Sequence, residues 1–238
     1  MTLLFENSDF IVVAKPAGMN FHSEEEAGFV VLAKALAGAD ELYPVHRLDK
    51  MTSGLVLLAK TKTAAQRFGE MFENREVEKY YLAVSLRKPK KKQGWIKGDM
   101  EKARRGDWKL AKTAENPAVT RFLSAPLREG ERAFLVKPYT GKTHQIRVAL
   151  KSLGSPIAGD ERYADKSEAQ KEERGYLHAY ALRFAFGGET FAFVAPPETG
   201  GRFRTPAFAA LLETWRTPWE VFPEKTKASR AAGQQQDF

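Results

Sequence analysis

The sequence predicts an α+β fold with a mainly antiparallel mixed sheet and flanking helices. Short segments that alternate or run apolar, as strands do, outnumber segments with helical periodicity. Two of the strand-like segments are separated by Gly187-Gly188, a strong hairpin signal. No linker rich in Pro, Gly and Ser divides the 238 residues, so we expect one domain over residues 1–222 and a polar, disordered tail over residues 223–238.

Strands are expected where apolar, aromatic and β-branched residues follow one another between turn residues. The run at Phe10–Lys15 ends at Pro16-Ala17-Gly18, which closes it with a turn. The run at residues 54–60 is apolar up to Lys60 and predicts a buried strand. The full set of expected strands is Phe10–Lys15, 54–60, 77–86, 118–124, 132–139, Leu177–Phe186 and 190–194.

Three further segments have the periodicity of helices. One carries Ile146, Ala149 and Leu150 on a single face. Another opens with Thr205, a natural N-cap, followed by Pro206, which fits the first turn of a helix. The expected helices are residues 63–72, 143–153 and 205–215.

Composition excludes several classes of protein. The chain is 43% hydrophobic and 29% charged, which is ordinary for a globular protein. No stretch approaches the roughly 18–20 apolar residues of a membrane helix, and the N-terminus lacks the basic and apolar regions of a secretory signal. The absence of cysteine excludes disulfides and thiolate metal sites, and it suits a reducing compartment. We therefore expect a cytoplasmic protein that does not enter the membrane.

The positive charge is confined to one segment. The net charge is +8, and residues 87–112 contain 11 of the 38 basic and 3 of the 30 acidic residues, so the rest of the chain is balanced. Trp95 and Trp108 lie in this basic insertion, and basic residues beside aromatics suit phosphate contacts and base stacking. A solvated loop that only aids solubility is the alternative. The candidate contacts to a nucleic-acid backbone are Lys90, Lys91, Lys92, Arg104 and Arg105.

Two polar clusters carry the candidate chemistry. Residues 46–54 read HRLDKMTSG and come directly before an apolar strand, where a rigid scaffold can hold functional side chains. Taken alone, Asp49 in such a place can equally be a turn or cap residue. Residues 141–147 read GKTHQIR, which places His144 and Arg147 side by side on a helix. A half-buried Arg there needs a carboxylate partner, so a purely structural ion pair is also an option.

The two clusters together resemble the RluA-type pseudouridine synthases. Residues 46–55 are similar to that family's H-R-L-D-x-x-T-S-G-L signature, and residues 141–147 to its G-R-T-H-Q-I-R motif. The resemblance runs from about Phe5 to Phe208. Further matches, in chain order, are Lys15-Pro16-Ala17-Gly18, Lys79-Tyr80-Tyr81-Leu82-Ala83, Pro156-Ile157-Ala158-Gly159-Asp160 with Tyr163, and Leu177-His178-Ala179.

The resemblance implies one catalytic domain with a central cleft. It implies an isomerase that breaks the bond between uracil N1 and ribose C1′, rotates the base, and joins C1′ to C5. The implied partner is RNA, either ribosomal or transfer RNA. The resemblance further implies no cofactor or metal, no obligate protein partner and a monomer.

Residue by residue, the motifs assign roles to this chain. Asp49 matches the essential carboxylate, which attacks carbon or removes a ribose proton, and Arg147 matches the Arg that pairs with it. Tyr81 matches an active-site Tyr that stacks on the base and accepts a proton later, although a plain strand-face aromatic is the alternative. Arg47 matches a residue that replaces the everted base, and Ile146 an apolar wall. The other expected substrate-binding residues are His46, Thr52, Ser53, His144 and Gln145.

The chain departs from the family pattern at Lys142, where Arg is usual, and at Tyr139-Thr140, where Leu or Ile precedes T-G more often. Lys keeps the charge but loses the forked hydrogen bonding of Arg. Two other functions stay open from the sequence. One is an RNA-binding protein that has lost activity, although Asp49, Tyr81 and Arg147 are all present. The other is a hydrolase, which would need a second catalytic carboxylate near Asp49.

Overall fold

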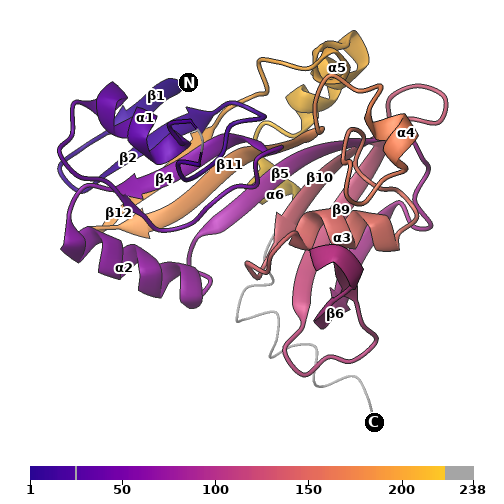
Figure 1. Ribbon diagram of the computed structural model, residues 1–238, viewed down its shortest axis with the longest axis horizontal. Coiled ribbons are helices and arrows are strands. Elements are labelled where there is room, and N and C mark those ends of the chain that lie inside the picture. The colour runs from indigo at the N-terminus through magenta and orange to yellow at the C-terminus, as the bar shows by residue number, and fades with distance from the viewer. Residues whose placement is uncertain (25, 223–238) are drawn as a thin grey trace.

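A 10-stranded sheet runs through the whole molecule in the computed structural model (Figure 1). The structure describes residues 1–24 and 26–222, so the tail expected over residues 223–238 lies outside the described residues. The strand order is β1-β2-β4-β11-β5-β10-β9-β6, with β12 added to β11 and β3 to β4. The strands of this sheet are β1 Thr2–Glu6, β2 Phe10–Lys15, β3 Tyr43–Pro44, β4 Ser53–Ala59, β5 Glu78–Ser85, β6 Gln93–Gly98, β9 Ala118–Pro126, β10 Arg132–Pro138, β11 Leu177–Phe186 and β12 Glu189–Val194.

The sheet is antiparallel except at its centre. There β11 runs parallel to β4, with Ser53 beside His178 and Gly54 beside Ala179, while its other neighbours β5 and β12 are antiparallel. Parallel neighbours begin at the same end of a sheet, so the residues just before β4 and β11 come together in the middle of the molecule. This confirms the predicted α+β fold with a mainly antiparallel mixed sheet.

Helices cover both halves of the sheet and bury the apolar side chains of its strands. The half that holds β2 and β4 carries α1 (Phe29–Ala37) and α2 (Lys62–Glu73), and α3 (Gln145–Ser152) lies over the half that holds β9 and β10 (Figure 1). Alternate residues of β4 pack with α1 and α2 on opposite faces, which is why the whole strand is buried. The remaining helices are α4 (Lys166–Ala169), α5 (Pro206–Thr214) and α6 (Pro218–Val221).

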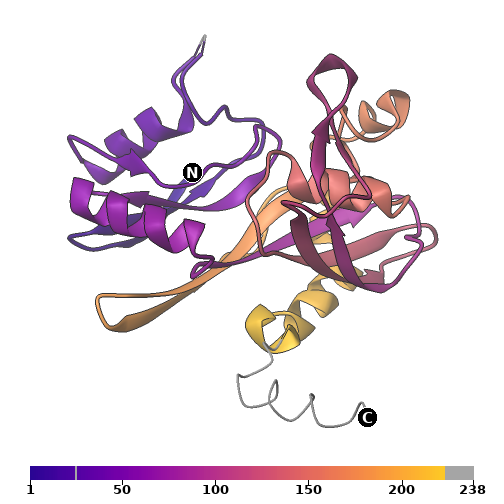
Figure 2. The ribbon, with the colours of Figure 1, turned by 90° about the horizontal axis from the view of Figure 1, so that it is seen from below.

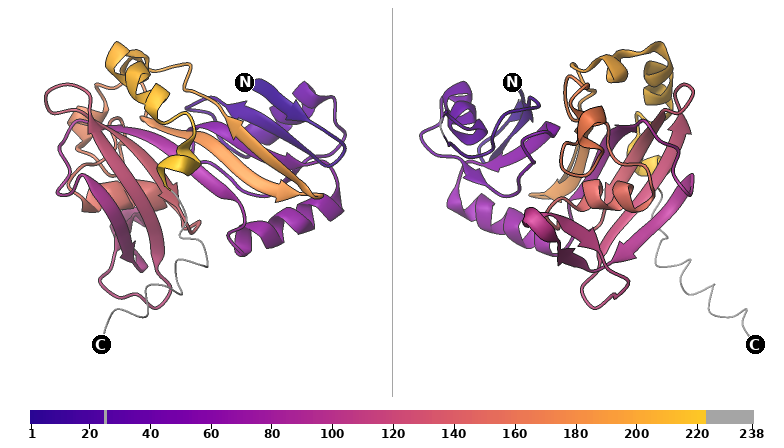
Figure 3. Two further views of the ribbon diagram at one scale, coloured as in Figure 1. Left: turned by 180° about the vertical axis from the view of Figure 1, so that it is seen from behind. Right: turned by 45° about the vertical axis from the view of Figure 1, so that its right-hand side comes forward.

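From behind, α5 and α6 cross the middle of the sheet (Figure 3). Phe208 of α5 is fully buried in the core cluster that also contains Tyr80 and Leu135. Thr205 caps α5 as expected, because its side chain accepts the backbone N–H of Phe208, and Pro206 occupies the first turn. Within the described residues, no helix is long and apolar enough to span a membrane.

The basic insertion differs most from what the sequence suggested. Instead of interrupting the fold, β6 pairs with β9 as the edge strand of the main sheet. After it, β7 (Met100–Lys102) and β8 (Trp108–Leu110) form a separate hairpin on the half of the molecule that carries α3 (Figure 2). Buried Ile96 lies between exposed Trp95 and Lys97, so the alternation of a strand is present but is masked by the surrounding lysines.

Candidate active site

A cleft of about 520 Å³ opens where β4, β11 and β5 meet. Its walls come from the turn before β4, from Tyr81 on β5, and from the loop and first turn that lead into α3. Among the residues predicted as catalytic or substrate-binding, those that line it are Asp49, Tyr81, Arg147, His46, Arg47, Thr52, His144, Gln145 and Ile146.

Asp49 lies in the turn that enters β4, where its carbonyl oxygen accepts the N–H of Thr52 at 3.0 Å. Its Oδ2 accepts a hydrogen bond from Nη1 of Arg147 at 2.9 Å. The Asp49 side chain is 24% exposed and the Arg147 side chain 8%. The carboxylate is therefore open to the cleft while its guanidinium partner is held in the wall.

Asp160 fixes the orientation of Arg147. This carboxylate is fully buried and accepts Nε and Nη2 of Arg147, both at 2.8 Å. Its Oδ1 also accepts the backbone N–H groups of Arg162 and Tyr163. A bidentate pair holds the planar guanidinium in one orientation, which leaves Nη1 aimed at Asp49. Sequence reasoning assigned Asp160 no role beyond its place in a motif. The signal for its role was that a half-buried Arg needs a carboxylate partner.

Lys15 is a second cation beside Asp49 that sequence reasoning did not assign to the site. Its side chain is 1% exposed, and Nζ donates to the carbonyl oxygens of Pro16, Lys50 and Thr52 at 3.0, 3.3 and 2.9 Å. Burial lowers its pKa to about 8, and the charge of Asp49 opposes that shift. Lys15 thus binds two carbonyl groups of the turn that follows Asp49, and its position in the Lys-Pro-Ala-Gly motif was the available signal.

His144 faces Asp49 from the other side. It takes a left-handed backbone conformation with φ 55°, so α3 begins at Gln145 rather than at the expected Thr143. Its Nε2 is 4.0 Å from Oδ1 of Asp49, and its Nδ1 is 2.8 Å from the hydroxyl of Tyr163. Burial lowers the pKa of His144, with Asp49 acting in the opposite direction.

The hydroxyl of Tyr163 joins this site to the β7–β8 hairpin. It accepts the backbone N–H of Trp108 at 3.0 Å. A neutral His144 that accepts the Tyr163 hydroxyl proton at Nδ1 carries its own proton on Nε2, directed at Asp49. The Tyr163 ring also packs against the guanidinium of Arg147, with Cζ of Arg147 5.0 Å from the centre of the ring. Tyr163 therefore touches both residues that flank the carboxylate.

Tyr81 lies in the middle of β5, beside Val136 of β10 and Ala179 of β11. The side chain is half-buried and lines the cleft. Burial raises the pKa of its hydroxyl, and the negative charge of Asp49 raises it further. The phenol is therefore neutral at physiological pH and presents an aromatic ring near the carboxylate.

Two of the predicted substrate-binding side chains make hydrogen bonds within the protein. The Nε2 of His46 accepts the N–H of Leu57 at 2.9 Å, and burial lowers the pKa of this histidine to about 3. Gln145 accepts from the Thr140 hydroxyl and the Lys142 N–H, and donates to Val119 and Thr120. Both side chains hold the walls of the cleft in place.

Cations at the cleft are better placed to meet a charged substrate. Arg47 is exposed and makes no hydrogen bond or ion pair with any residue that the structure describes. Lys79 also lines the cleft, with Nζ 5.4 Å from the Phe72 ring, and burial lowers its pKa to about 8. Arg75 also lines the cleft and, like Arg47, is exposed.

Other predicted residues lie away from the cleft. The Ser53 hydroxyl is bonded to Nδ1 of His178 at 2.7 Å and to Nη2 of Arg174 at 2.6 Å, and it does not line the cleft. Arg104 is exposed in the turn between β7 and β8, and the side chain of its neighbour Arg105 lies outside the described residues. Lys90, Lys91 and Lys92 are exposed before β6, on the edge of the sheet, and do not line the cleft either.

Comparison with known proteins agrees with this geometry. Residues 9–152 match the family model described as RNA pseudouridylate synthase. An uncharacterized RNA pseudouridine synthase of Haemophilus influenzae is 43% identical over 216 residues, which cover 90% of this chain and 96% of that protein. The ribosomal large subunit pseudouridine synthase C of the same organism is 33% identical over 81% of this chain and 64% of its own length.

Solved structures show the same fold. Human RNA pseudouridylate synthase domain containing 1 has a TM-score of 0.73 and 25% identity, covering 91% of this chain and 94% of that chain. Human RNA pseudouridylate synthase domain containing 4 has a TM-score of 0.68 and 28% identity, over 90% of this chain and 92% of that chain. With the family model matching more than half of its residues, the chain belongs to the RNA pseudouridylate synthase family and is a pseudouridine synthase, an isomerase that acts on RNA.

Proposed function

We propose that this synthase isomerises uridine in ribosomal or transfer RNA and that Asp49 is its catalytic carboxylate. The observation that carries the proposal is the position of Asp49 in the cleft, hydrogen-bonded to Arg147 at 2.9 Å and still partly exposed. Isomerisation breaks the bond from N1 to C1′ and forms the bond from C5 to C1′, while C5 loses a proton and N1 gains one. Attack on carbon and removal of a ribose proton both begin with an ionised carboxylate.

The surroundings of Asp49 support that role. Two cations lie near the carboxylate, the guanidinium of Arg147 and the buried ammonium of Lys15. The Nε2 of His144 lies 4.0 Å away, close enough to donate to Asp49 after a small movement. Together these groups hold a negative charge at one point of the cleft before the substrate arrives, which lowers the reorganisation needed during the reaction.

Tyr81 and Ile146 are proposed to hold the base. Both line the cleft, where a uracil can stack on the Tyr81 ring and rest against the apolar side chain of Ile146. The raised pKa of Tyr81 keeps its hydroxyl protonated before the reaction. In the last step this hydroxyl is proposed to relay the proton that leaves C5.

Arg47 is proposed to occupy the space that the extruded base leaves in the RNA. Removing a base from a stack costs a few kcal/mol, which an inserted side chain partly offsets. The exposed guanidinium of Arg47, at the cleft and without a described partner, is suited to this role.

A hydrolase that uses two carboxylates has little support from the geometry. The second carboxylate bound to Arg147 is Asp160, which is fully buried and accepts hydrogen bonds with both oxygens. It cannot position a water molecule in the cleft without giving up Arg147. Of the two carboxylates bound to Arg147, Asp49 is the one that opens into the cleft, which supports Asp49 as the reactive one.

The direct test is incubation of the protein with unmodified transcripts of large-subunit ribosomal RNA and, separately, of transfer RNA, followed by nucleoside analysis. Ribosomal RNA comes first because a relative at 33% identity is named for the large ribosomal subunit. Pseudouridine in one of the two RNA classes is the expected result. Free uracil would indicate a hydrolase, and unchanged RNA of both classes would contradict the proposed substrates.

A further inference from the structure

The largest exposed aromatic side chain in the described part of the chain lies outside the cleft. Trp95 on the edge strand β6 is 49% exposed, whereas Trp215 is 3% exposed and Trp108 is half-buried. Exposure of a large apolar ring to water is unfavourable, and a ligand that covers the ring gains free energy. Side chains of its own strand and of the neighbouring strand β9 contact the ring but leave about half of Trp95 exposed.

Charged and aromatic side chains surround this ring. Nζ of Lys97 and the guanidinium of Arg121 each lie 5.4 Å from the Trp95 ring, and the Tyr139 ring lies 5.0 Å from it at an angle of 39°. Trp95 and Lys97 project from one face of β6, and Arg121 projects from the same face because it is the register partner of Trp95. We call Trp95, Lys97, Arg121 and Tyr139 the Trp95 platform.

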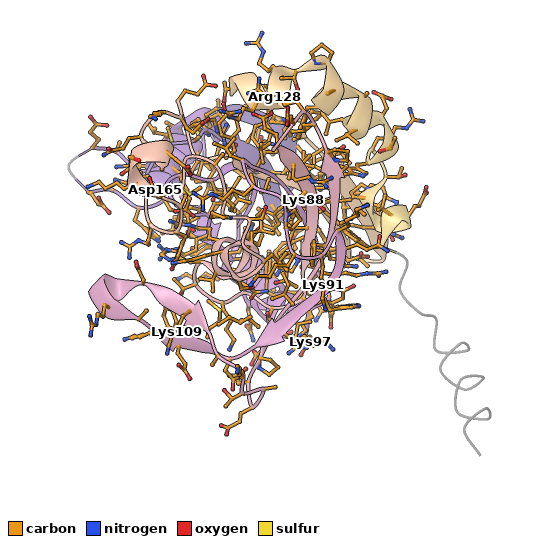
Figure 4. All side chains as sticks on the ribbon, turned by 90° about the vertical axis from the view of Figure 1, so that its right-hand side faces the viewer. Lys88, Lys91, Lys97, Lys109, Arg128 and Asp165 are labelled. Atoms are coloured by element: carbon orange, nitrogen blue, oxygen red, sulfur yellow. The ribbon has the colours of Figure 1, made fainter. Side chains whose placement is uncertain are left out.

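More positive charge continues along the same edge. Lys90, Lys91 and Lys92 are exposed directly before β6, and no described carboxylate forms an ion pair with them or with Lys97. Figure 4 shows Lys88, Lys91 and Lys97 along this edge. No acidic residue occurs between Arg87 and Gly98. The edge therefore combines a stacking surface with a row of cations.

The Trp95 platform is joined to the rim of the cleft. Val119 of β9 is the register partner of Lys97 on β6. The backbone N–H of Val119 donates to the hydroxyl of Thr140 at 2.9 Å. Thr140 and Lys142 line the cleft, and Tyr139 of the platform directly precedes them. An RNA strand that leaves the cleft beside Lys142 and passes round the end of β9 would meet the platform next.

We propose that the Trp95 platform is a second RNA-binding surface, which stacks a base of single-stranded RNA flanking the modified uridine on Trp95 and places the adjoining phosphates on Lys97 and the neighbouring lysines. The inference rests on the RNA substrate of the proposed function. Stacking on an aromatic side chain is tolerant of sequence, and basic residues beside it neutralise phosphates, which is how single strands are bound. Duplex RNA keeps its bases stacked on one another and has none to offer to Trp95.

The proposal is tested by the binding of the full chain to fluorescein-labelled poly(U), measured by fluorescence anisotropy. Trp95→Ala should weaken binding about 5- to 150-fold, the range expected for one stacked base, and Trp95→Phe should lose less because a ring remains. Neither variant should change the dependence on salt, because neither removes a charge. Poly(U) should also quench tryptophan fluorescence in the wild type and not in Trp95→Phe.

Lys97→Gln should act differently. It should reduce the slope of log affinity against log salt by about 0.7, as expected when one phosphate contact to a single strand is lost. The controls are Leu36→Ala, which removes an exposed apolar side chain on α1, and Lys166→Gln, which removes an exposed charge on α4. Both controls should leave poly(U) binding unchanged.

Three results would overturn the proposal. These are unchanged poly(U) affinity in Trp95→Ala, an equal loss of affinity for poly(U) and for an RNA duplex in that variant, and displacement of poly(U) by polyglutamate as effectively as by unlabelled poly(U). The last result would indicate a surface for acidic proteins. Because the measured quantity is RNA affinity and does not depend on turnover, these outcomes are separate from a failure of the proposed catalytic role of Asp49.

Discussion

The carboxylate of Asp49 and the guanidinium of Arg147 form a hydrogen bond of 2.9 Å, although 98 positions separate the two residues in the sequence. Asp49 belongs to the turn before β4 and Arg147 to α3, so the contact joins the two halves of the sheet across the cleft. Because Asp160 binds the Nε–Nη2 edge of the guanidinium, the position of the Asp49 carboxylate depends on a chain of charged contacts that ends in the core.

Asp160→Asn tests that chain of contacts. The variant keeps the shape of the side chain but removes the charge that orients Arg147. We expect a loss of about 3 kcal/mol in the free energy of unfolding, because a fully buried ion pair loses one charged partner. Turnover should fall more than RNA affinity. Urea unfolding and initial rates of conversion measure the two effects.

The matched control for this variant is Asp165→Asn, at the exposed N-cap of α4, where Asn caps as well as Asp. It should cost less than about 0.5 kcal/mol, as surface substitutions do. Similar losses in the two variants would show that the buried contact to Arg147 does not stabilise the fold.

Tyr163→Phe tests the link from the β7–β8 hairpin to His144. The ring that packs under Arg147 stays, but His144 loses its partner at Nδ1 and the N–H of Trp108 loses its acceptor. We expect the turnover number to fall about 5-fold with little change in KM, since one hydrogen bond is worth roughly 1 kcal/mol.

A second background separates positioning from a general structural effect. If Tyr163 acts through His144, adding Tyr163→Phe to His144→Ala should cause no further loss of turnover. If the loss of turnover in the double variant equals the product of the two single losses, the Tyr163 hydroxyl acts independently of His144.

Arg47→Ala tests the role of this side chain in extruding the base. Conversion of a structured RNA should fall about 10-fold or more, and conversion of a flexible fragment with the same uridine should fall less, because only the structured RNA requires unstacking. Arg75→Ala, which removes another exposed charge at the cleft, should affect both substrates alike. An equal loss of conversion on both RNAs in Arg47→Ala would contradict the role in extruding the base and indicate only an effect of charge.

His178 makes the fold sensitive to acid. Burial lowers its pKa from the ordinary value of 6.5 to about 4, and its two nitrogens are bonded to Ser53 and the Ala195 carbonyl. In the unfolded chain His178 takes up a proton below about pH 6.5, but in the folded protein only below about pH 4. The stability that depends on neutral His178 is therefore complete above pH 6.5 and is lost as the pH falls toward 4.

The expected contribution is roughly 3 kcal/mol over that interval. Urea unfolding at about pH 7 and about pH 4 measures it, and His178→Gln should lose less stability on acidification than the wild type does. Some acid sensitivity should remain in the variant because burial lowers the pKa of His46 in the same way. Parallel stability curves for variant and wild type would contradict this origin.

Sequence reasoning located most of the cleft because the signatures are contiguous. The segments 46–54 and 141–147 each contain several residues that line it, and their apolar neighbours identified β4 and α3. The strand β2 was predicted with its observed bounds, since its apolar run ends at a turn with Pro and Gly. Such features depend on neighbours in the chain and are therefore readable from it.

The contacts that complete the site depend on residues that are distant in the sequence. Nothing near Asp160 shows that it will bind Arg147, and nothing near Lys15 shows that its ammonium will hold the turn after Asp49. The left-handed conformation of His144 moved the start of α3 by two residues, because periodicity does not report the backbone of a single residue before a helix. The strand β6 was missed since its lysines obscured a short alternation.

The most direct test of the whole account compares conversion and binding in Asp49→Asn. The substitution keeps the size of the side chain and removes its negative charge. RNA from incubations with the variant should contain no pseudouridine, while the dissociation constant for the same RNA stays close to that of the wild type. Pseudouridine formed by the variant at a rate near that of the wild type would contradict the assignment of Asp49 as the catalytic carboxylate.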